Sequence, residues 1–223
     1  MNTTYDLIVI GGGASGMMAA GRAGERGLRV LLLEKNKRLG EKLRISGGGR
    51  CNITNAEKDV RVFLKKYGAS EQFLYSLFTQ FGVEDTFAFF ESRNLPLKVE
   101  VGKRAFPHTE KAEDVVNVLE QYLKYGGVAV RTHMTVTKVS IHDGAIESVA
   151  CGKEIFKAKE YLLATGSLSH GETGSTGDGF AWLRQMGHTL TTPTPTIVPL
   201  RVKERWVKDL AGVSLSAMKI TFY

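Results

Sequence analysis

The sequence contains few cysteines and no long apolar run. Its two cysteines, Cys51 and Cys151, stand 151 − 51 = 100 positions apart in a chain of 223 residues. This number and spacing exclude a disulfide scaffold and a four-cysteine zinc site, and they are typical of a reducing compartment. No stretch approaches the roughly eighteen consecutive apolar residues of a membrane-spanning helix. Met1 leads into a strand-like segment without a basic region or cleavage site, so we expect a cytoplasmic protein without a secretory signal or membrane partner.

The composition excludes a largely disordered chain. Apolar residues make up 43% and charged residues 24%, which is close to an average soluble globular protein. Lysine and arginine exceed the acidic residues by 30 − 23 = 7. A basic excess of this size suits either a nucleic acid or a phosphate-rich cofactor. The length allows one large domain or two small ones.

The N-terminal residues predict a strand, a glycine turn, a helix and a second strand. Tyr5–Ile10 and Val30–Leu33 are short, apolar and rich in branched side chains, and small residues fill 17–23 between them. Short apolar runs of this kind are typical of strands that are buried on both faces. We therefore expect a complete right-handed βαβ unit within the first 34 residues.

The turn within this unit carries a dinucleotide-binding fingerprint. Gly11, Gly13 and Gly16 open the helix, and Glu34 stands 34 − 16 = 18 residues further on, at the end of the second strand. The glycines allow a tight turn, the approach of a pyrophosphate and close packing of helix on strand. The helix N-terminus places backbone amides against phosphates, and Glu34 accepts ribose hydroxyls while repelling a 2′-phosphate. The alternative is a tight turn with no ligand.

A second glycine signal favours FAD over NAD as the nucleotide. Short alternating segments from residue 128 onward predict a β-meander, with a hairpin turn at Asp143-Gly144. An apolar strand then ends in Ala164-Thr165-Gly166. A βαβ unit, a meander and a strand ending in this way are the layout of FAD-binding Rossmann domains of the glutathione-reductase type. We expect Val136, on a meander strand, to offer its backbone to the adenine.

The residues between the two halves of this pattern predict helices. Residues 70–93 have apolar side chains at helical spacing with a break at Gly82, and we expect these to pack a core rather than to line a substrate site: Phe73, Leu77, Phe78, Phe81, Phe87 and Phe90. Pro96 and Pro107 bracket a loop or short hairpin. Thr109 is expected to cap a further helix, which Gly126 ends.

The loop over residues 42–55 is the most distinctive stretch. It combines three consecutive glycines with cationic and hydrogen-bonding side chains: Lys42, Arg44, Ser46, Gly47, Gly48, Gly49, Arg50, Asn52 and Thr54. Such a combination suits a pyrophosphate and the polar edge of a flavin. The alternative is a basic surface loop.

These motifs resemble a flavoprotein family of aminoacetone-oxidase-like and 3-dehydro-bile-acid-reductase-like NAD(P)/FAD-dependent oxidoreductases. The residues that carry the resemblance are 11–16, Glu34 and Lys35, Lys42, 46–55, 102–107, Lys111 and Ala112, 164–166, 174–179, Gly187 and His188, and Pro199 and Leu200. The resemblance implies an FAD enzyme that moves hydride between flavin N5 and a small molecule, with NAD(P)H or oxygen as the other partner. The expected FAD-binding residues are Gly11, Gly13, Ala14, Ser15, Gly16, Glu34, Lys35, Lys42, Ser46, Gly48, Gly49, Arg50, Cys51, Asn52, Val136, Thr165, Gly166 and Asp178.

The sequence departs from the family at two points. Ser167 stands where the family usually has a second glycine after Ala-Thr-Gly, which is tolerable with an ordinary backbone φ. Family members also continue well past residue 223, so we expect an N-terminal part of a longer enzyme. The expected organisation is an α/β FAD-binding Rossmann domain over 1–192, with a helical insertion at about 56–125 and a meander at about 128–158. The start of a β-rich second domain follows over 193–223.

No residue stands out as a catalytic acid or base, and no acid or histidine spacing indicates a metal. Cys51 lies in the expected flavin loop, but without a second nearby thiol we interpret it as a packed residue rather than a redox centre. Asp178 suits both a helix cap and a cofactor ligand. Two other functions stay open: a flavoprotein acting on RNA, which the absence of stacking aromatics disfavours, and a non-catalytic nucleotide-binding remnant. The sequence does not reveal the substrate, the oligomeric state or whether NADH or NADPH is the reductant.

Overall fold

The computed structural model describes residues 5–195 and 202–213. The chain divides into two compact units, Met1–Leu190 and Thr191–Tyr223. In the second unit the described structure is a 3₁₀ helix, η4 (Arg205–Leu210). The strands expected within 212–223 lie almost wholly outside the described residues.

The first unit is built on a four-stranded parallel sheet. Its strands are β1 (Tyr5–Ile10), β2 (Val30–Leu33), β6 (Ala129–Arg131) and β10 (Ala158–Leu163), in the order β10-β1-β2-β6. The first two strands match the sequence prediction residue for residue. β2 is buried along its whole length, which explains why its sequence is continuously apolar rather than alternating. The strand order runs to one side of β1 through β2 and β6 and to the other through β10, so a switch point falls at β1.

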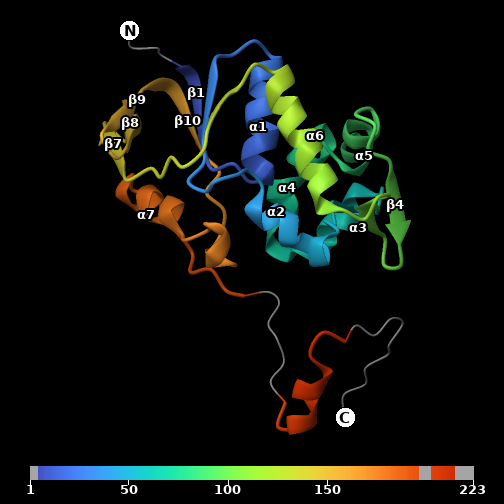
Figure 1. Cartoon of the computed structure of the whole chain (residues 1–223). Helices are drawn as coiled ribbons and strands as arrows, with labels where there is room; N and C mark the ends of the chain where they lie inside the picture. Colours follow the sequence, from blue (N-terminus) through green and yellow to red (C-terminus); the bar gives the residue numbers. More distant parts are fainter. Residues whose placement is uncertain (1–4, 196–201, 214–223) are drawn as a thin grey trace. The chain divides into compact units, whose positions relative to one another are not determined.

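Helices cover one face of this sheet and a small antiparallel sheet covers the other (Figure 1). α1 (Ala14–Glu25) and α6 (Ala112–Tyr125) pack side by side on the first face. On the second face lies a meander of β7 (Lys138–His142), β8 (Ala145–Cys151) and β9 (Glu154–Phe156). Asp143 and Gly144 both have positive φ in the β7–β8 turn, as the hairpin prediction requires.

The meander is shorter than the expected 128–158. β6 pairs in parallel with β2 and therefore belongs to the main sheet. Its three residues, Ala129–Arg131, are too few to show an alternation that would distinguish the two sheets in the sequence. Val136 is also not on a strand: it lies in an extended segment before β7. Its side chain nevertheless packs in the core between the two sheets.

A helical insertion lies between β2 and α6. Its elements are α2 (Glu41–Ile45), η1 (Ser46–Gly49), β3 (Thr54–Asn55), α3 (Val60–Leu64), η2 (Lys65–Ser70), α4 (Glu71–Gln80), α5 (Val83–Glu91), β4 (Leu97–Glu100) and β5 (Arg104–Pro107). The predicted break at Gly82 separates α4 from α5. β3, β5 and β4 form a small antiparallel sheet, so of the loop or short hairpin expected between the two prolines the structure has the hairpin.

Two predictions for these helices are wrong. Phe73, Leu77 and Phe81, on α4 and at its C-cap, do not pack a core, since they are 74%, 51% and 45% exposed. Helical spacing shows that they share a face, but it does not show what covers that face. α6 begins at Ala112, two residues later than a cap at Thr109 would place it, and Lys111 precedes it without a side-chain cap.

The remaining elements of the first unit follow β10. They are η3 (Gly171–Thr173) and α7 (Asp178–Gln185). Gly177 precedes α7 and Asp178 is its first residue, with no side-chain cap, so the capping role expected for Asp178 is wrong. Over residues 5–195 and 202–213, no helix is long and apolar enough to cross a membrane.

Candidate nucleotide-binding site

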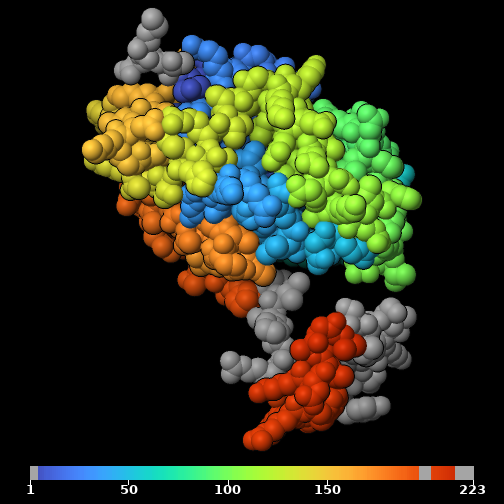
Figure 2. Space-filling model, in the orientation of Figure 1, coloured from blue at the N-terminus to red at the C-terminus, as the bar shows by residue number. Residues whose placement is uncertain are grey.

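A cavity of about 450 Å³ lies at the carboxyl ends of β1, β2 and β10. In open parallel sheets this edge, at the switch point of the strand order, is where ligands bind. Four segments far apart in the sequence line the cavity: 10–15, 33–46, 134–136 and 164–182. Figure 2 shows the blue surface after β2 lying between the yellow-green surface near α6 and the orange surface before α7.

The glycine turn places the N-terminus of α1 in this cavity. Gly13 precedes the helix without a side-chain cap, and the first turn carries no acidic residue. The first amides of a helix have no intrahelical partner, so those of Ala14 and Ser15 remain available to a ligand. Both residues are exposed and line the cavity. A Cβ on Gly16 would lie 1.9 Å from the Gly11 carbonyl oxygen, so only glycine allows this close helix–strand packing.

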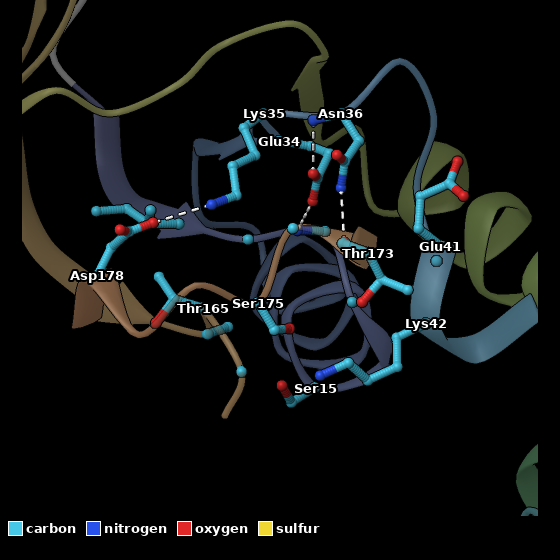
Figure 3. Close-up of a pocket in the computed structure, with 18 of the residues that line it drawn as sticks. Ser15, Glu34, Lys35, Asn36, Glu41, Lys42, Thr165, Thr173, Ser175 and Asp178 are labelled. Carbon is cyan, nitrogen blue, oxygen red and sulfur yellow. Dashed lines mark hydrogen bonds and ion pairs between the residues drawn. The ribbon is translucent and has the colours of Figure 1, made fainter. Parts of the chain in front are cut away.

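Glu34 fixes the turn from the end of β2. It is 7% exposed, and its carboxylate accepts hydrogen bonds from the amides of Gly12 (2.6 Å) and Asn36 (2.8 Å). Figure 3 shows it between Asn36 and the glycine turn. Each carboxylate oxygen has capacity for a further donor. The side chain can therefore hold the turn and accept ribose hydroxyls together.

A polar network joins the segment after β2 to the start of α7 (Figure 3). The Lys35 ammonium donates to Asp178 Oδ2 (2.9 Å) and Thr176 Oγ1 (2.8 Å). Asn36 Nδ2 donates to the Thr173 carbonyl (3.0 Å). The hydrogen bond from Lys35 holds the pKa of the Asp178 carboxyl below its usual range. Asp178 thus positions Lys35 and closes one wall of the cavity.

Lys42 supplies a cation at the opposite wall. Its ammonium donates to the Ser169 carbonyl (2.5 Å), and burial lowers its pKa. Its hydrogen bonds within the described residues go to neutral oxygens of Ser169, so its charge remains to attract an anion. Ser46, also in the lining, donates to the Leu43 carbonyl (2.7 Å).

The second half of the glycine-rich loop lies away from this cavity. Gly48, Gly49 and Arg50 are not in its lining. The Arg50 guanidinium pairs with Glu100 and Glu110 and stacks 4.2 Å from the Phe106 ring centroid. Its charge is therefore balanced by acidic side chains of the protein itself. These acids lie 50 and 60 residues away, so the pairing has no signal in the loop itself.

Cys51 and Asn52 line a neighbouring crevice instead. Cys51 is 1% exposed and has φ of 60°, a conformation that non-glycine residues rarely adopt. Burial raises the pKa of its thiol, which opposes thiolate chemistry and supports its interpretation as a packed residue. The Asn52 amide, in the orientation that satisfies its neighbours, donates to the carbonyls of Thr54 (3.1 Å) and Ala105 (3.2 Å).

Val136, Thr165 and Gly166 all line the main cavity. Gly166 has φ of 77°, whereas Ser167 is not among the residues with positive φ, so serine is tolerated there. The prediction missed several other lining residues: Gly12, Asn36, Met134, Thr135, Thr173, Ser175 and Trp182. Ser175 lies in the 174–179 motif and could have been included on that ground. Trp182 carries no comparable sequence signal.

The cavity fits an adenine dinucleotide. A Cβ on Gly13 would meet nothing within 4 Å, so the space beside the helix amides is open for a phosphate group. Val136 has no backbone hydrogen-bond partner for its amide within the described part of the chain, which leaves that donor available to an adenine edge. No group of three or more metal-ligating side chains is found among the residues described.

The fold and this cavity define a Rossmann domain of the FAD-binding type. The chain belongs to the HI0933-like protein Rossmann domain family, whose family model matches residues 5–220. This confirms the family resemblance and the fold class predicted from the sequence.

Relatives and solved structures agree with this placement. The chain is 34% identical over 211 residues to the 3-dehydro-bile acid delta(4,6)-reductase of Clostridium scindens, covering 94% of this chain and 50% of that protein. It is 26% identical over 217 residues to the ribosomal RNA dihydrouridine synthase of Escherichia coli, covering 96% and 53%. A flavocytochrome c3 fumarate reductase shares the fold with a TM-score of 0.67 at 21% identity, covering 82% of this chain and 40% of that one. The chain thus spans about half the length of the curated relatives it matches.

Proposed function

We propose that this chain is the FAD-binding portion of an oxidoreductase that moves hydride between flavin and an organic small molecule. The observation that carries the proposal is the uncapped N-terminus of α1, set beside Glu34 in a cavity at the switch point of the sheet. When bound, FAD supplies the two-electron redox chemistry, and the protein supplies binding and orientation. NAD(P)H or oxygen is the proposed second partner.

The proposed roles of the residues follow from their positions. The amides of Ala14 and Ser15 hold the pyrophosphate, with Lys42 as the nearby cation. Glu34 accepts the adenosine ribose hydroxyls, and the Val136 backbone meets the adenine edge. Lys35 and Asp178 fix the wall that carries Thr165 and Gly166. Ser46, in the cavity lining, extends this set toward the flavin. Gly48, Gly49, Arg50, Cys51 and Asn52 lie outside that lining and are not part of the proposed contacts.

A charge placed at Ser15 tests the binding mode. Ser15 is exposed at the first turn of α1, where a carboxylate stabilises a helix but repels a pyrophosphate. We expect Ser15→Asp to unfold no more readily than the wild type, yet to lose at least tenfold in FAD affinity. The matched control is Ser76→Asp, at an exposed position on α4 outside the cavity lining. Unchanged FAD affinity in Ser15→Asp contradicts the proposal.

Redox competence is tested on the FAD-loaded chain. NADH and NADPH are added separately without oxygen, and the visible absorbance of the protein-bound flavin is followed. We expect one of them to bleach it and air to restore it. A chain that retains FAD but is reduced by neither nucleotide has no reductase function by itself.

Chemistry on RNA is a second candidate, because the Escherichia coli relative is a ribosomal RNA dihydrouridine synthase. The basic segment after β2 gives it little support, since half of its ten cations over residues 35–66 pair with acidic side chains of the protein. Arg44 pairs with Glu113, Arg38 with Glu41 and Lys58 with Glu84. RNA binding that weakens steeply with salt would favour this candidate.

A further inference from the structure

A second crevice, of about 260 Å³, adjoins the nucleotide cavity. It lies among α1, α5, α6 and the segment after the glycine-rich loop, and it shares Ala14, Ser15 and Leu43 with the nucleotide cavity. The two spaces therefore meet at the N-terminus of α1. None of the proposed contacts to the phosphates, ribose or adenine uses the part of the crevice beyond these three residues.

The lining of the crevice carries no charged side chain. It consists of Ala14, Ser15, Met18, Leu43, Cys51, Asn52, Ile53, Phe81, Thr86, Phe89, Phe90, Val115 and Leu119. Charged residues make up 24% of the chain, so a lining without any of them is unusual. The only titratable group, Cys51, has a pKa raised by burial. A charged ligand would lose hydration here without gaining a partner, whereas an apolar one would gain by burial.

The aromatic walls are held in place. Phe89 and Phe90 are 8% and 7% exposed and meet edge to face at 5.1 Å between ring centroids. The Phe89 ring also meets the Tyr122 ring edge to face, with 5.1 Å between the ring centroids. The Arg93 guanidinium lies over the Phe89 ring, 4.0 Å from its centroid. Fixed aromatic rings favour a flat ligand that can pack against their faces and edges.

A few polar atoms in the crevice can orient a bound ligand. Thr86 Oγ1 donates to the Gly82 carbonyl (2.8 Å), and its oxygen retains capacity to accept a further hydrogen bond. Ser15 stands at the junction with the nucleotide cavity. Largely apolar walls with a few polar groups are the usual character of small-molecule sites.

We propose that this crevice binds the ring of a flat, uncharged organic substrate, at the end of the cofactor cavity away from the adenine. The assignment to substrate rests on the proposed FAD function, whereas the binding of such a ring does not. Phe81, at the C-terminal end of α4 and 45% exposed, forms the outer rim.

The test is a titration with 2-naphthol, followed through the ¹³C methyl signals of Met18, Val115 and Leu119. We expect saturable shifts of these signals. 2-Naphthoate, which has the same ring system with a charge, should bind at least tenfold more weakly. Absence of shifts at these methyls, or equal affinity for both probes, overturns the proposal.

Variants locate the binding. Thr86→Phe should fill the crevice and abolish binding, and Phe81→Ala should weaken it at least threefold without disturbing the core. Phe73→Ala is the matched control, because Phe73 is exposed on the same helix and is absent from the lining. An equal effect of Phe73→Ala and Phe81→Ala would assign the probe to the face of α4 and overturn the proposal.

FAD separates a substrate site from a cofactor site. The titration is repeated on the FAD-loaded chain, where we expect 2-naphthol to bind with its affinity retained within threefold. Competition between FAD and 2-naphthol would show that the flavin itself fills the crevice, which overturns the substrate assignment. If the chain binds no FAD, the proposed function fails while the titration of the unloaded chain still decides whether the crevice binds rings.

Discussion

At the scale of single residues, Glu34 connects the fold to the proposed ligand. Its carboxylate accepts the amides of Gly12 and Asn36, so it fixes the glycine turn whether or not a nucleotide is present. The hydrogen bond from Lys35 to Asp178 fixes the wall at the start of α7. Glu34 and Lys35 are consecutive at the end of β2, and Asp178 begins α7. Each shapes the cavity through contacts with backbone or with another segment.

Glu34→Gln should weaken FAD binding about tenfold or more. The amide retains one acceptor oxygen but places an NH₂ group against a backbone donor, and charge-assisted hydrogen bonds contribute about 1.5–3 kcal/mol. Isothermal titration with FAD measures the change. Glu41→Gln is the matched control, since Glu41 also lines the cavity but pairs with Arg38 at the surface. Equal losses in both variants would contradict the assigned role of Glu34.

Residue roles were predictable from the sequence where the partners are close along the chain. The glycine turn and Glu34 belong to one βαβ unit, so their spacing fixes their geometry. The local charge of the glycine-rich loop predicts Arg50 as a cofactor ligand, whereas the structure pairs it with Glu100 and Glu110. Sequence spacing contains no information on such a distant pairing.

At the scale of elements, α1 and α6 approach closely because of glycines. A Cβ on Gly21 would lie 2.4 Å from Tyr122 Cδ1, and one on Gly24 would lie 2.3 Å from the Gly126 carbonyl oxygen. The Tyr122 hydroxyl completes the contact by donating to Glu25 (2.8 Å). This contact sets the position of α1, whose N-terminus lines both cavities.

Gly21→Ala should destabilise the chain by up to about 2 kcal/mol. Alanine favours the helix by roughly 1 kcal/mol, but overpacking against a fixed ring costs about 1–3 kcal/mol. Urea denaturation measures the free energy of unfolding. On a Tyr122→Leu background the same substitution should be neutral or stabilising. A Gly21→Ala variant that is more stable than the wild type would contradict the close approach of the helices.

Element types and most boundaries were predictable, but burial on the insertion was not. The break at Gly82 and the hairpin between the prolines follow from local propensities. The apolar face of α4 has the same spacing as a core-facing helix, yet Phe73 and Leu77 are exposed. Periodicity identifies a face, whereas only the tertiary fold shows what packs against it.

At the scale of the whole molecule, the site is a product of topology. The parallel sheet brings the carboxyl ends of β1, β2 and β10 to one edge, although β1 and β10 are more than a hundred residues apart in the sequence. The meander prediction placed Val136 beside the adenine, and the structure puts it in the same cavity on an extended segment. Trp182 joins it there from α7, which no local motif indicated.

Trp182 provides the most direct test of the account. The chain has two tryptophans, and Trp206→Phe leaves Trp182 as the only one, in the cavity wall near Val136. The fluorescence of this variant is titrated with FAD, ADP and FMN. We predict saturable quenching by FAD and by ADP, because both place adenine beside Trp182, and none by FMN at the same concentrations. An unchanged emission with FAD and ADP, or quenching by FMN alone, would contradict the assignment of this cavity to the adenine half of FAD.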